Sequence, residues 1–181
     1  MNLRTKSVAV AALLAFGALA GTISPASAGT SSGYVSGSGT WTDDMNDEGP
    51  ISTSSHSHSN AAAMWQAILW ADGYLTSTSK IDCVFGSGTR SATLNWQSDF
   101  PRTTADGVVG PATLEEAMLT HIRDDSTSSY LTLTYNGETA DSIFTGRYVT
   151  FTRNTDGIWG MYIGSDHHLL SYSYANFNNC A

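Results

Sequence analysis

The chain has 181 residues, of which 41% are hydrophobic and 13% are charged, and its formal net charge is −8. A chain this acidic is not drawn to nucleic acid or to an anionic membrane by charge, so neither is an expected partner. The length suits one or two small domains.

Residues 1–28 have the features of a secretory signal peptide. Arg4 and Lys6 form a positive region, residues 9–19 form an apolar run, and ASA at 26–28 is a small-residue cleavage site. The apolar run is too short to span a membrane, so we expect export with no membrane attachment after cleavage. Six basic and sixteen acidic residues follow the cleavage site, so the mature chain has a formal charge of six minus sixteen, or −10.

Residues 29–59 are rich in Gly, Ser and Thr, a composition typical of a linker. Trp41 is the exception, because a large aromatic side chain rarely occurs in a spacer, and we expect it to dock on the neighbouring domain. Two histidines in this segment, His56 and His58, are two residues apart and could share a metal ion if the chain is extended.

Three helices are expected after this segment. The first spans residues 60–72 with Asn60 as its N-cap, the second spans 87–99, and the third runs from Pro111 to about residue 122. This part, residues 60–122, is predicted to be a three-helix domain.

The pattern changes to β in residues 123–181. Four segments alternate or are rich in β-formers, and we expect Asn136-Gly137 and Asp156-Gly157 to form turns between them. Helices followed by strands predict an α+β fold with a small antiparallel meander. The four expected strands are 130–135, 147–153, 158–163 and 169–174.

One nine-residue phrase occurs twice, as IDCVFGSGT at 81–89 and as ADGVVGPAT at 105–113. Each copy should make a tight turn, place two apolar residues in the core and start a helix, with its Thr hydroxyl meeting unpaired amide groups. The pair Trp-Gln also occurs twice, at 65–66 and at 96–97, which is a second sign of the duplication.

These segments, with WQAILWADGY before them, resemble the peptidoglycan-binding domain of type 1 over about residues 60–118. The resemblance implies a three-helix module that binds bacterial wall peptidoglycan without catalysing a reaction. The chain departs from the family pattern at Cys83, where a turn glycine is usual, at Thr93, where an aliphatic residue is usual, and at Leu94, where a solvated residue is usual. We expect Leu94, Trp70 and Ile68 to form an apolar patch covered by the C-terminal strands.

The candidate ligand contacts are Trp70, Tyr74, Asn95 and Gln97. Each has an alternative interpretation as a packing or helix-surface residue, and for Gln97 a structural hydrogen bond to loop backbone is the favoured alternative. The two cysteines of an exported chain commonly pair, which predicts a Cys83–Cys180 disulfide; two free thiols are the alternative.

The remaining sequence offers no recognisable catalytic constellation, so the protein is not expected to be an enzyme. HExxH is missing from the sequence, and Asp166-His167-His168 is interpreted as a turn rather than a metal site. No metal or cofactor is expected. The meander could offer aromatic rings to a sugar, through Tyr130, Trp159, Tyr172 and Tyr174, but packing within half-buried strands is the favoured alternative for these rings.

The sequence therefore predicts a secreted or wall-associated monomer whose partner is peptidoglycan. Two alternatives from other classes stay open: a cell-wall hydrolase with a small catalytic C-terminal lobe, and a secreted inhibitor or accessory protein.

Overall fold

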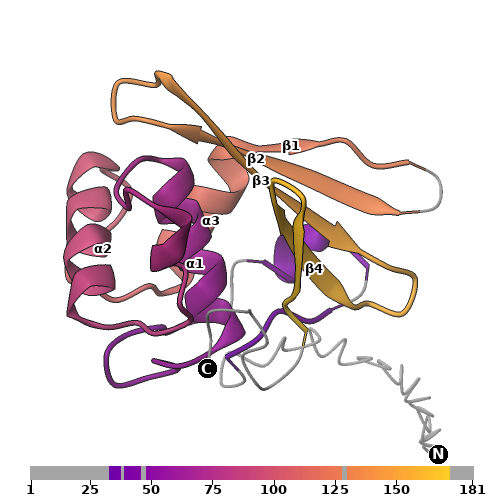
Figure 1. Ribbon diagram of the computed structural model, residues 1–181, viewed down its shortest axis with the longest axis horizontal. Helices are drawn as coiled ribbons and strands as arrows, with labels where there is room; N and C mark the ends of the chain where they lie inside the picture. Colours follow the sequence, from indigo (N-terminus) through magenta and orange to yellow (C-terminus); the bar gives the residue numbers. More distant parts are fainter. Residues whose placement is uncertain (1–32, 38, 46–47, 128–129, 172–181) are drawn as a thin grey trace, which may run out of the picture.

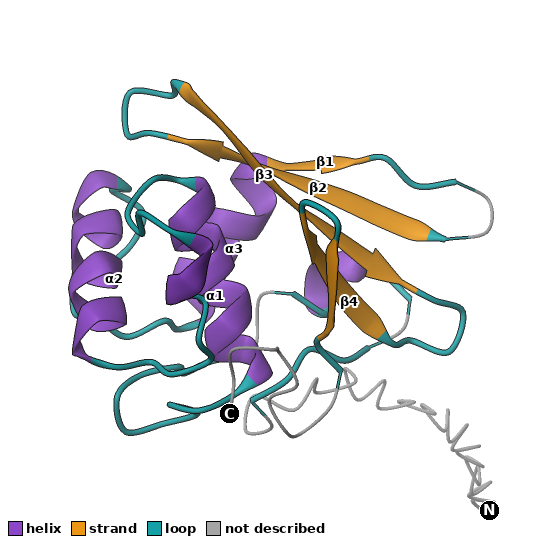
Figure 2. Cartoon of the chain, in the orientation of Figure 1, coloured by secondary structure: helices purple, strands orange, loops and turns teal. Residues whose placement is uncertain are grey.

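Three helices lie on one side of a five-stranded antiparallel sheet, two of them packed directly against it (Figure 1). The computed structural model describes residues 33–37, 39–45, 48–127 and 130–171. The α+β class predicted from the sequence is confirmed, and Figure 2 shows the separation of the helices from the strands. The helices are α1 (Asn60–Ala71), α2 (Ser87–Asp99) and α3 (Pro111–His121), with 3-10 turns η1 (Trp41–Asp43) and η2 (Thr78–Lys80).

The sheet follows chain order, β1-β2-β3-β4-β5, with every neighbouring pair antiparallel. It has one strand more than the sequence predicted, because three residues directly after α3 pair with the first strand of the meander. The last strand ends at Leu169, where the expected strand 169–174 was to begin. Its strands are β1 (Ile122–Asp124), β2 (Leu131–Glu138), β3 (Phe144–Arg153), β4 (Trp159–Ile163) and β5 (Asp166–Leu169).

Two predicted turns are strands. Asn136-Gly137 lies inside β2 at a register shift, and the hairpin turns at residues 139–143 instead. Gly137 is required there by a close approach, because a Cβ atom on it would stand 2.1 Å from the Ala71 carbonyl oxygen of α1. Asp166-His167-His168 begins β5, and the turn before it uses Gly164 at φ +62°. The Asp156-Gly157 turn is confirmed, with Gly157 at φ +77°.

The helix starts are close to prediction, with one correction. Ser59, rather than Asn60, is the N-cap of α1, and its hydroxyl accepts a hydrogen bond from the Ala62 amide at 3.0 Å. Asparagine and serine are about equally good N-cap residues, but Asn60 is here already helical and buried, so the residue before it takes the cap.

Two buried tryptophans hold α1 and α2 together. The rings of Trp65 and Trp96 meet edge to face with centroids 5.1 Å apart. Thr93 explains one departure from the family pattern, because its hydroxyl accepts the Trp65 indole hydrogen at 2.8 Å and donates to the Thr89 carbonyl. An aliphatic residue there would leave the buried indole N–H without this acceptor.

The C-terminal end of α1 is capped by the sheet. Thr145 of β3 donates to the Ala71 carbonyl at 2.6 Å, and Arg147 donates to the Trp70 carbonyl at 2.7 Å. These carbonyls end a helix and need partners from outside it, and a cation there also suits the helix dipole. The Arg147 guanidinium lies over the Trp70 ring at 5.5 Å, so Trp70 is covered from β3 as the sequence predicted.

The predicted apolar patch is only partly formed. Ile68 is fully buried and Trp70 is half-buried against the sheet, but Leu94 lies elsewhere. The Leu94 side chain lies beside Gly107, against the loop of the second repeat. Leu94 therefore packs within the helical part rather than under the strands.

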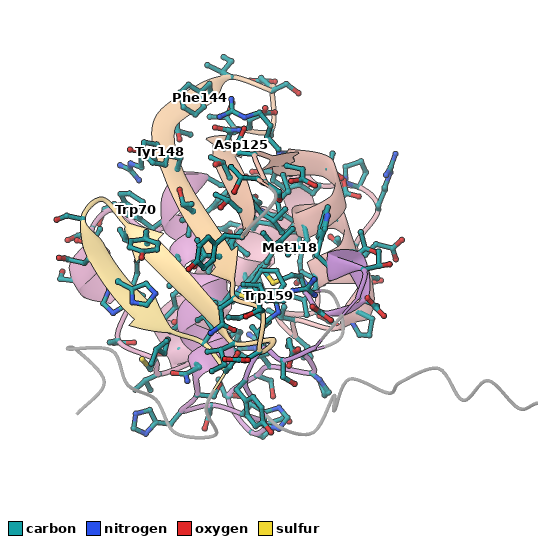
Figure 3. The ribbon with its side chains drawn as sticks, turned by 90° about the vertical axis from the view of Figure 1, so that its right-hand side faces the viewer. Trp70, Met118, Asp125, Phe144, Tyr148 and Trp159 are labelled. Atoms are coloured by element: carbon teal, nitrogen blue, oxygen red, sulfur yellow. The ribbon has the colours of Figure 1, made fainter. Side chains whose placement is uncertain are left out.

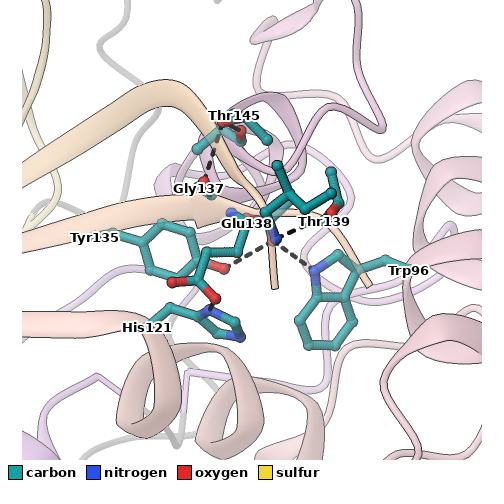
Figure 4. A network of polar contacts seen from close by, with 10 residues as sticks. Trp96, His121, Tyr135, Gly137, Glu138, Thr139 and Thr145 are labelled. Atoms are coloured by element: carbon teal, nitrogen blue, oxygen red, sulfur yellow. Dashed lines mark hydrogen bonds and ion pairs between the residues drawn. The ribbon is translucent and has the colours of Figure 1, made fainter. Parts of the chain in front are cut away.

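Asp72 joins three elements through one buried carboxylate. Figure 4 labels three of the residues around it, Trp96, Tyr135 and Glu138. It lies at the end of α1 and accepts the Trp96 indole of α2 at 2.6 Å and the Tyr135 hydroxyl of β2 at 2.7 Å. Its second oxygen accepts the backbone amide of Glu138 at 3.0 Å. The helical part and the sheet are therefore linked by the hydrogen bonds to this carboxylate, within a continuous hydrophobic core.

The segment expected to be a linker is folded onto both halves of the molecule wherever the structure describes it. Val35, Met45 and Ile51 are fully buried. Asp44 accepts an ion-paired hydrogen bond from Arg153 of β3 and another from the Trp159 indole at 3.2 Å. Composition misleads here because the few apolar and charged residues among the Gly, Ser and Thr make the contacts.

We expect Asp72→Ala to lower the free energy of unfolding by about 3–5 kcal/mol, because Trp96, Tyr135 and the Glu138 amide would lose a buried acceptor. Chemical denaturation measures the change. Asp99→Ala is the matched control, since the Asp99 carboxylate accepts the Tyr74 hydroxyl at the surface and its removal should cost less than about 1 kcal/mol. Equal losses for the two variants would contradict the role given to Asp72.

Asp72 also predicts a pH dependence. Burial raises its pKa from 3.8 to about 6, against the hydrogen bonds from Tyr135, Trp96 and Glu138 that lower it. Between these two values the folded state holds a proton that the unfolded state releases, so this contribution to stability falls as the pH rises. Lowering the pH from about 7 to about 4 should stabilise the wild type relative to Asp72→Asn by about 2–3 kcal/mol.

Paired denaturation curves across this range check the prediction. Burial lowers the pKa of His121, which makes the fold less stable in acid, but this effect is common to both proteins and cancels in the difference. A difference that stays constant with pH would rule out titration of Asp72.

Candidate ligand-binding site

The repeated phrase folds into two equivalent loops, each fastened by a glutamine. In the first, the Gln66 amide nitrogen donates to Asp82 Oδ1 at 2.7 Å, to the Val84 carbonyl at 3.1 Å and to Thr89 Oγ1 at 3.0 Å. The Gln66 amide oxygen accepts from the Cys83 amide at 2.9 Å. One side chain thus ties the turn, the loop and the first turn of α2 together.

The second loop repeats this arrangement in detail. Gln97 donates to Asp106, the Val108 carbonyl and Thr113, at 3.3, 2.8 and 3.1 Å, and accepts from the Gly107 amide at 2.8 Å. The threonine hydroxyls therefore accept from glutamine side chains and not from the helix-end amides that the sequence indicated. The duplication predicted from the sequence is confirmed in the geometry.

Each loop contributes one buried apolar side chain, and not the two that were expected. Phe85 and Val109 are buried, whereas Val84 is 44% exposed and Val108 is half-buried. Both loops also take a backbone partner from the segment expected to be a linker: Val109 exchanges two hydrogen bonds with Ile51, and Phe85 donates to the Ser57 carbonyl.

Cys83 occupies the backbone position that Gly107 occupies in the second loop. Cys83 has φ +62° and Gly107 has φ +73°, both in the left-handed region that favours glycine. A cysteine is kept there at a conformational cost of about 1 kcal/mol or more. Cys83 is buried, but Cys180 lies outside the described residues, so the disulfide stays a prediction.

A pocket of about 380 Å³ opens beside the first loop, between that loop, the N-terminus of α2 and the stretch that follows α1. Tyr74, Lys80 and the exposed Val84 line it, together with the backbone around Gly86 and Gly88. The pocket offers a phenol ring, an ammonium group, the Asp82 carboxylate and an apolar side chain at one opening. Such a mixture suits a ligand with both carboxylate or amide groups and apolar faces.

Of the four residues predicted from the sequence to contact ligand, Tyr74 alone lines this pocket. Its hydroxyl donates to Asp99 Oδ2 at 2.7 Å, and burial, followed by this hydrogen bond, raises the pKa of Tyr74 well above its ordinary value. Tyr74 therefore stays a neutral ring and hydroxyl at every physiological pH.

The other three predicted residues lie apart from the pocket. Trp70 is half-buried under Arg147, and Asn95 is exposed on α2. Gln97 is buried, and its amide forms hydrogen bonds within the second loop. This is the structural role that was favoured over ligand contact from the sequence. Lys80 and Val84 line the pocket but were not among the residues predicted from the sequence. The signal for Val84 was its position in the loop, since the first of the two apolar residues in each phrase is the more exposed one.

The histidines do not form a metal centre within the described ranges, where no group of three or more His, Cys, Asp or Glu side chains is placed to hold a metal ion. His56 Nδ1 lies 3.2 Å from the Pro50 carbonyl, and His58 is exposed and pairs with Val84 through the backbone. Within the same ranges, the helices are all too short or too polar to cross a membrane.

A duplicated three-helix module with glutamine-fastened loops is the class of domain that this geometry defines. Residues 58–116, about a third of the chain, match the family model described as a putative peptidoglycan binding domain, so the resemblance seen in the sequence is confirmed for this segment. The match indicates peptidoglycan binding and is consistent with association with the cell wall. No curated protein and no solved structure matches the chain.

We expect Gln97→Ala to destabilise the protein by about 2–4 kcal/mol, because the Gly107 amide, Asp106 and Thr113 would lose buried partners. Asn95→Ala, two residues away on the exposed face of α2, should leave stability within about 0.5 kcal/mol. Melting and wall binding measured on both variants separate the two roles of Gln97. A Gln97→Ala protein that melts normally but no longer binds wall material would establish it as a ligand contact instead.

Proposed function

We propose that the protein is an exported, non-catalytic binder of bacterial peptidoglycan, and that the pocket beside the first loop is its contact site. The observation that carries this proposal is the family match over residues 58–116 together with a pocket that only the first of the two equivalent loops lines. The signal-peptide pattern of residues 1–28 supports export, and these residues lie outside those that the structure describes.

The chemistry of the pocket suits peptidoglycan, a polymer of amino sugars carrying short peptides. Lys80 provides a cation for a peptide carboxylate, and the α2 N-terminus adds a positive end of the helix dipole at the same opening. The Tyr74 ring and the Val84 side chain can contact the apolar face of a sugar or an alanine methyl group. With a charge of −10 on the mature chain, attraction from the molecule as a whole does not explain binding to an anionic polymer, so local contacts must supply it.

The proposal is tested by sedimentation with insoluble peptidoglycan. We expect the mature protein to pellet with the polymer across a range of salt concentrations and to release no soluble fragments. Failure to pellet would overturn the wall-binding function, and release of fragments would favour the hydrolase alternative. A stoichiometric protein partner recovered in place of wall material would favour the inhibitor alternative.

The internal duplication provides a matched pair of variants for the pocket. Val84→Asp and Val108→Asp change equivalent residues whose backbone carbonyls accept the same glutamine hydrogen bonds, but only Val84 lines the pocket. We expect Val84→Asp to weaken binding by about tenfold or more, and Val108→Asp to retain it. Equal pelleting of the two variants would place the contact site elsewhere on the protein.

The predicted disulfide belongs to the same proposal of an exported protein. We expect both cysteines to resist alkylation until the unfolded protein is reduced, and reduction to destabilise the fold by up to about 4–5 kcal/mol, because the bond would close a loop on the order of 100 residues. Mass spectrometry after alkylation provides the measurement. Two cysteines alkylated without reduction would contradict the pairing.

A further inference from the structure

The outer face of the sheet, on the side away from the helices, holds a second pocket of about 440 Å³. Its floor is formed by neighbouring residues of the middle strands, Thr132, Thr152 and Gly160, which lie side by side in the register of β2, β3 and β4. Tyr130, Tyr162 and His167 stand around this floor. The pocket shares no residue with the one beside the first loop.

The aromatic side chains around the pocket are accessible, and two of the rings lie close together. Tyr130 is 60% exposed and Tyr162 is 36% exposed. The rings of Tyr162 and His167 lie with centroids 4.5 Å apart, which holds both beside the pocket. Gly160 leaves room for the imidazole, because a Cβ atom on it would stand 2.4 Å from His167 Nε2.

Further aromatic side chains continue this face along β3. Phe144 is 55% exposed and Tyr148 is 51% exposed, and they follow one another along the strand toward the hairpin end, whereas Trp159 lies toward the middle of the molecule (Figure 3). Alternation along the strand puts Tyr148 on the same face as Thr150 and Thr152. An extended ligand could therefore continue beyond the pocket in one direction.

The chemistry of the lining identifies the ligand class. Among the described residues that line this pocket there is no Asp, Glu, Lys or Arg, although the chain as a whole carries a large negative charge. Threonine hydroxyls and exposed tyrosine rings suit a neutral, hydroxyl-rich molecule with flat C–H faces. A charged peptide would find no partner charge, and a hydrophobic protein surface would leave the threonine hydroxyls unpaired.

We propose that this outer-face pocket is a second binding site, and that it takes a neutral oligosaccharide. The tyrosine rings of residues 130 and 162 stack on sugar faces, and the threonines and His167 hydrogen-bond the hydroxyl or N-acetyl groups. The proposal does not depend on the wall binding assigned to the helical part, because the two pockets lie on different elements. Four aromatic residues were named from the sequence as possible sugar contacts. Tyr130 lines this pocket and Trp159 is fully buried. Tyr172 and Tyr174 lie outside the described residues.

The test is an NMR titration of the isotope-labelled mature protein with two neutral probes, a β-1,4-linked tetramer of N-acetylglucosamine and cellotetraose. We expect saturable shifts at the amides of Thr132, Thr152 and Gly160 with one or both sugars. Binding to the first alone indicates recognition of the N-acetyl groups, and binding to both indicates recognition of the sugar faces and hydroxyls. Absence of saturable shifts with both sugars would overturn the proposal, as would a face buried by self-association of the protein.

Variants make the assignment specific. Tyr162→Ala should weaken the apparent affinity by about three- to tenfold, while Tyr162→Phe, which keeps the ring, should stay within about twofold of the wild type. Gly160→Ala should also weaken binding, because its methyl group displaces the His167 ring. Unchanged melting curves show that these variants fold, and undiminished sugar binding by Tyr162→Ala would contradict the site.

Val84→Asp separates this inference from the proposed function. It should retain sugar binding at the sheet while losing affinity for insoluble peptidoglycan. Wild-type protein that fails to pellet with peptidoglycan but still binds the tetramer would refute the function of the helical part alone. A protein that pellets but gives no shift at the sheet would refute the second site alone.

Discussion

The buried carboxylate of Asp72 is the point on which the arrangement of the two halves depends. It terminates α1 and accepts hydrogen bonds from α2 and from β2, so the helices and the sheet cannot separate without exposing it or leaving its donors unpaired. Around it, Thr145 caps the end of α1, and Gly137 brings the strand backbone within reach of the same helix. The protein therefore behaves physically as one body, although its sequence suggests a module followed by an appendage.

The helical half could be predicted well from the sequence because its signals are local and repeated. Helix periodicity, Pro111 at a helix start and two copies of one phrase all point to the same three helices, and the structure confirms them. The predicted N-cap of α1 was wrong by one residue. The predicted roles of the two threonines were also wrong, because the glutamines that bind Thr89 and Thr113 lie 23 and 16 residues away in the chain. Spacing shows that such residues recur, but not which atoms they meet.

The sheet and the candidate site depended on contacts that the sequence does not display. Asn136-Gly137 has the composition of a tight turn but lies in a strand, because its glycine is needed for close approach to Ala71. Whether an apolar residue faces the core or a pocket was equally invisible: Val84 and Phe85 are adjacent, and only one is buried. Only the first of the two equivalent loops lines the pocket. The second loop therefore serves as a structural reference for the first.

The N-terminal segment 33–59, where described, contacts the loops of both repeats through Ile51 and Ser57 and the sheet through Asp44. A recombinant fragment trimmed to the boundaries of the family match would begin after Ile51 and would also lack the sheet. It would expose Val109 and the end of α1 to water. Poor solubility of such a fragment would reflect missing scaffolding rather than a defective binding surface, and grafting this module onto another protein requires these flanking contacts to be carried along or replaced.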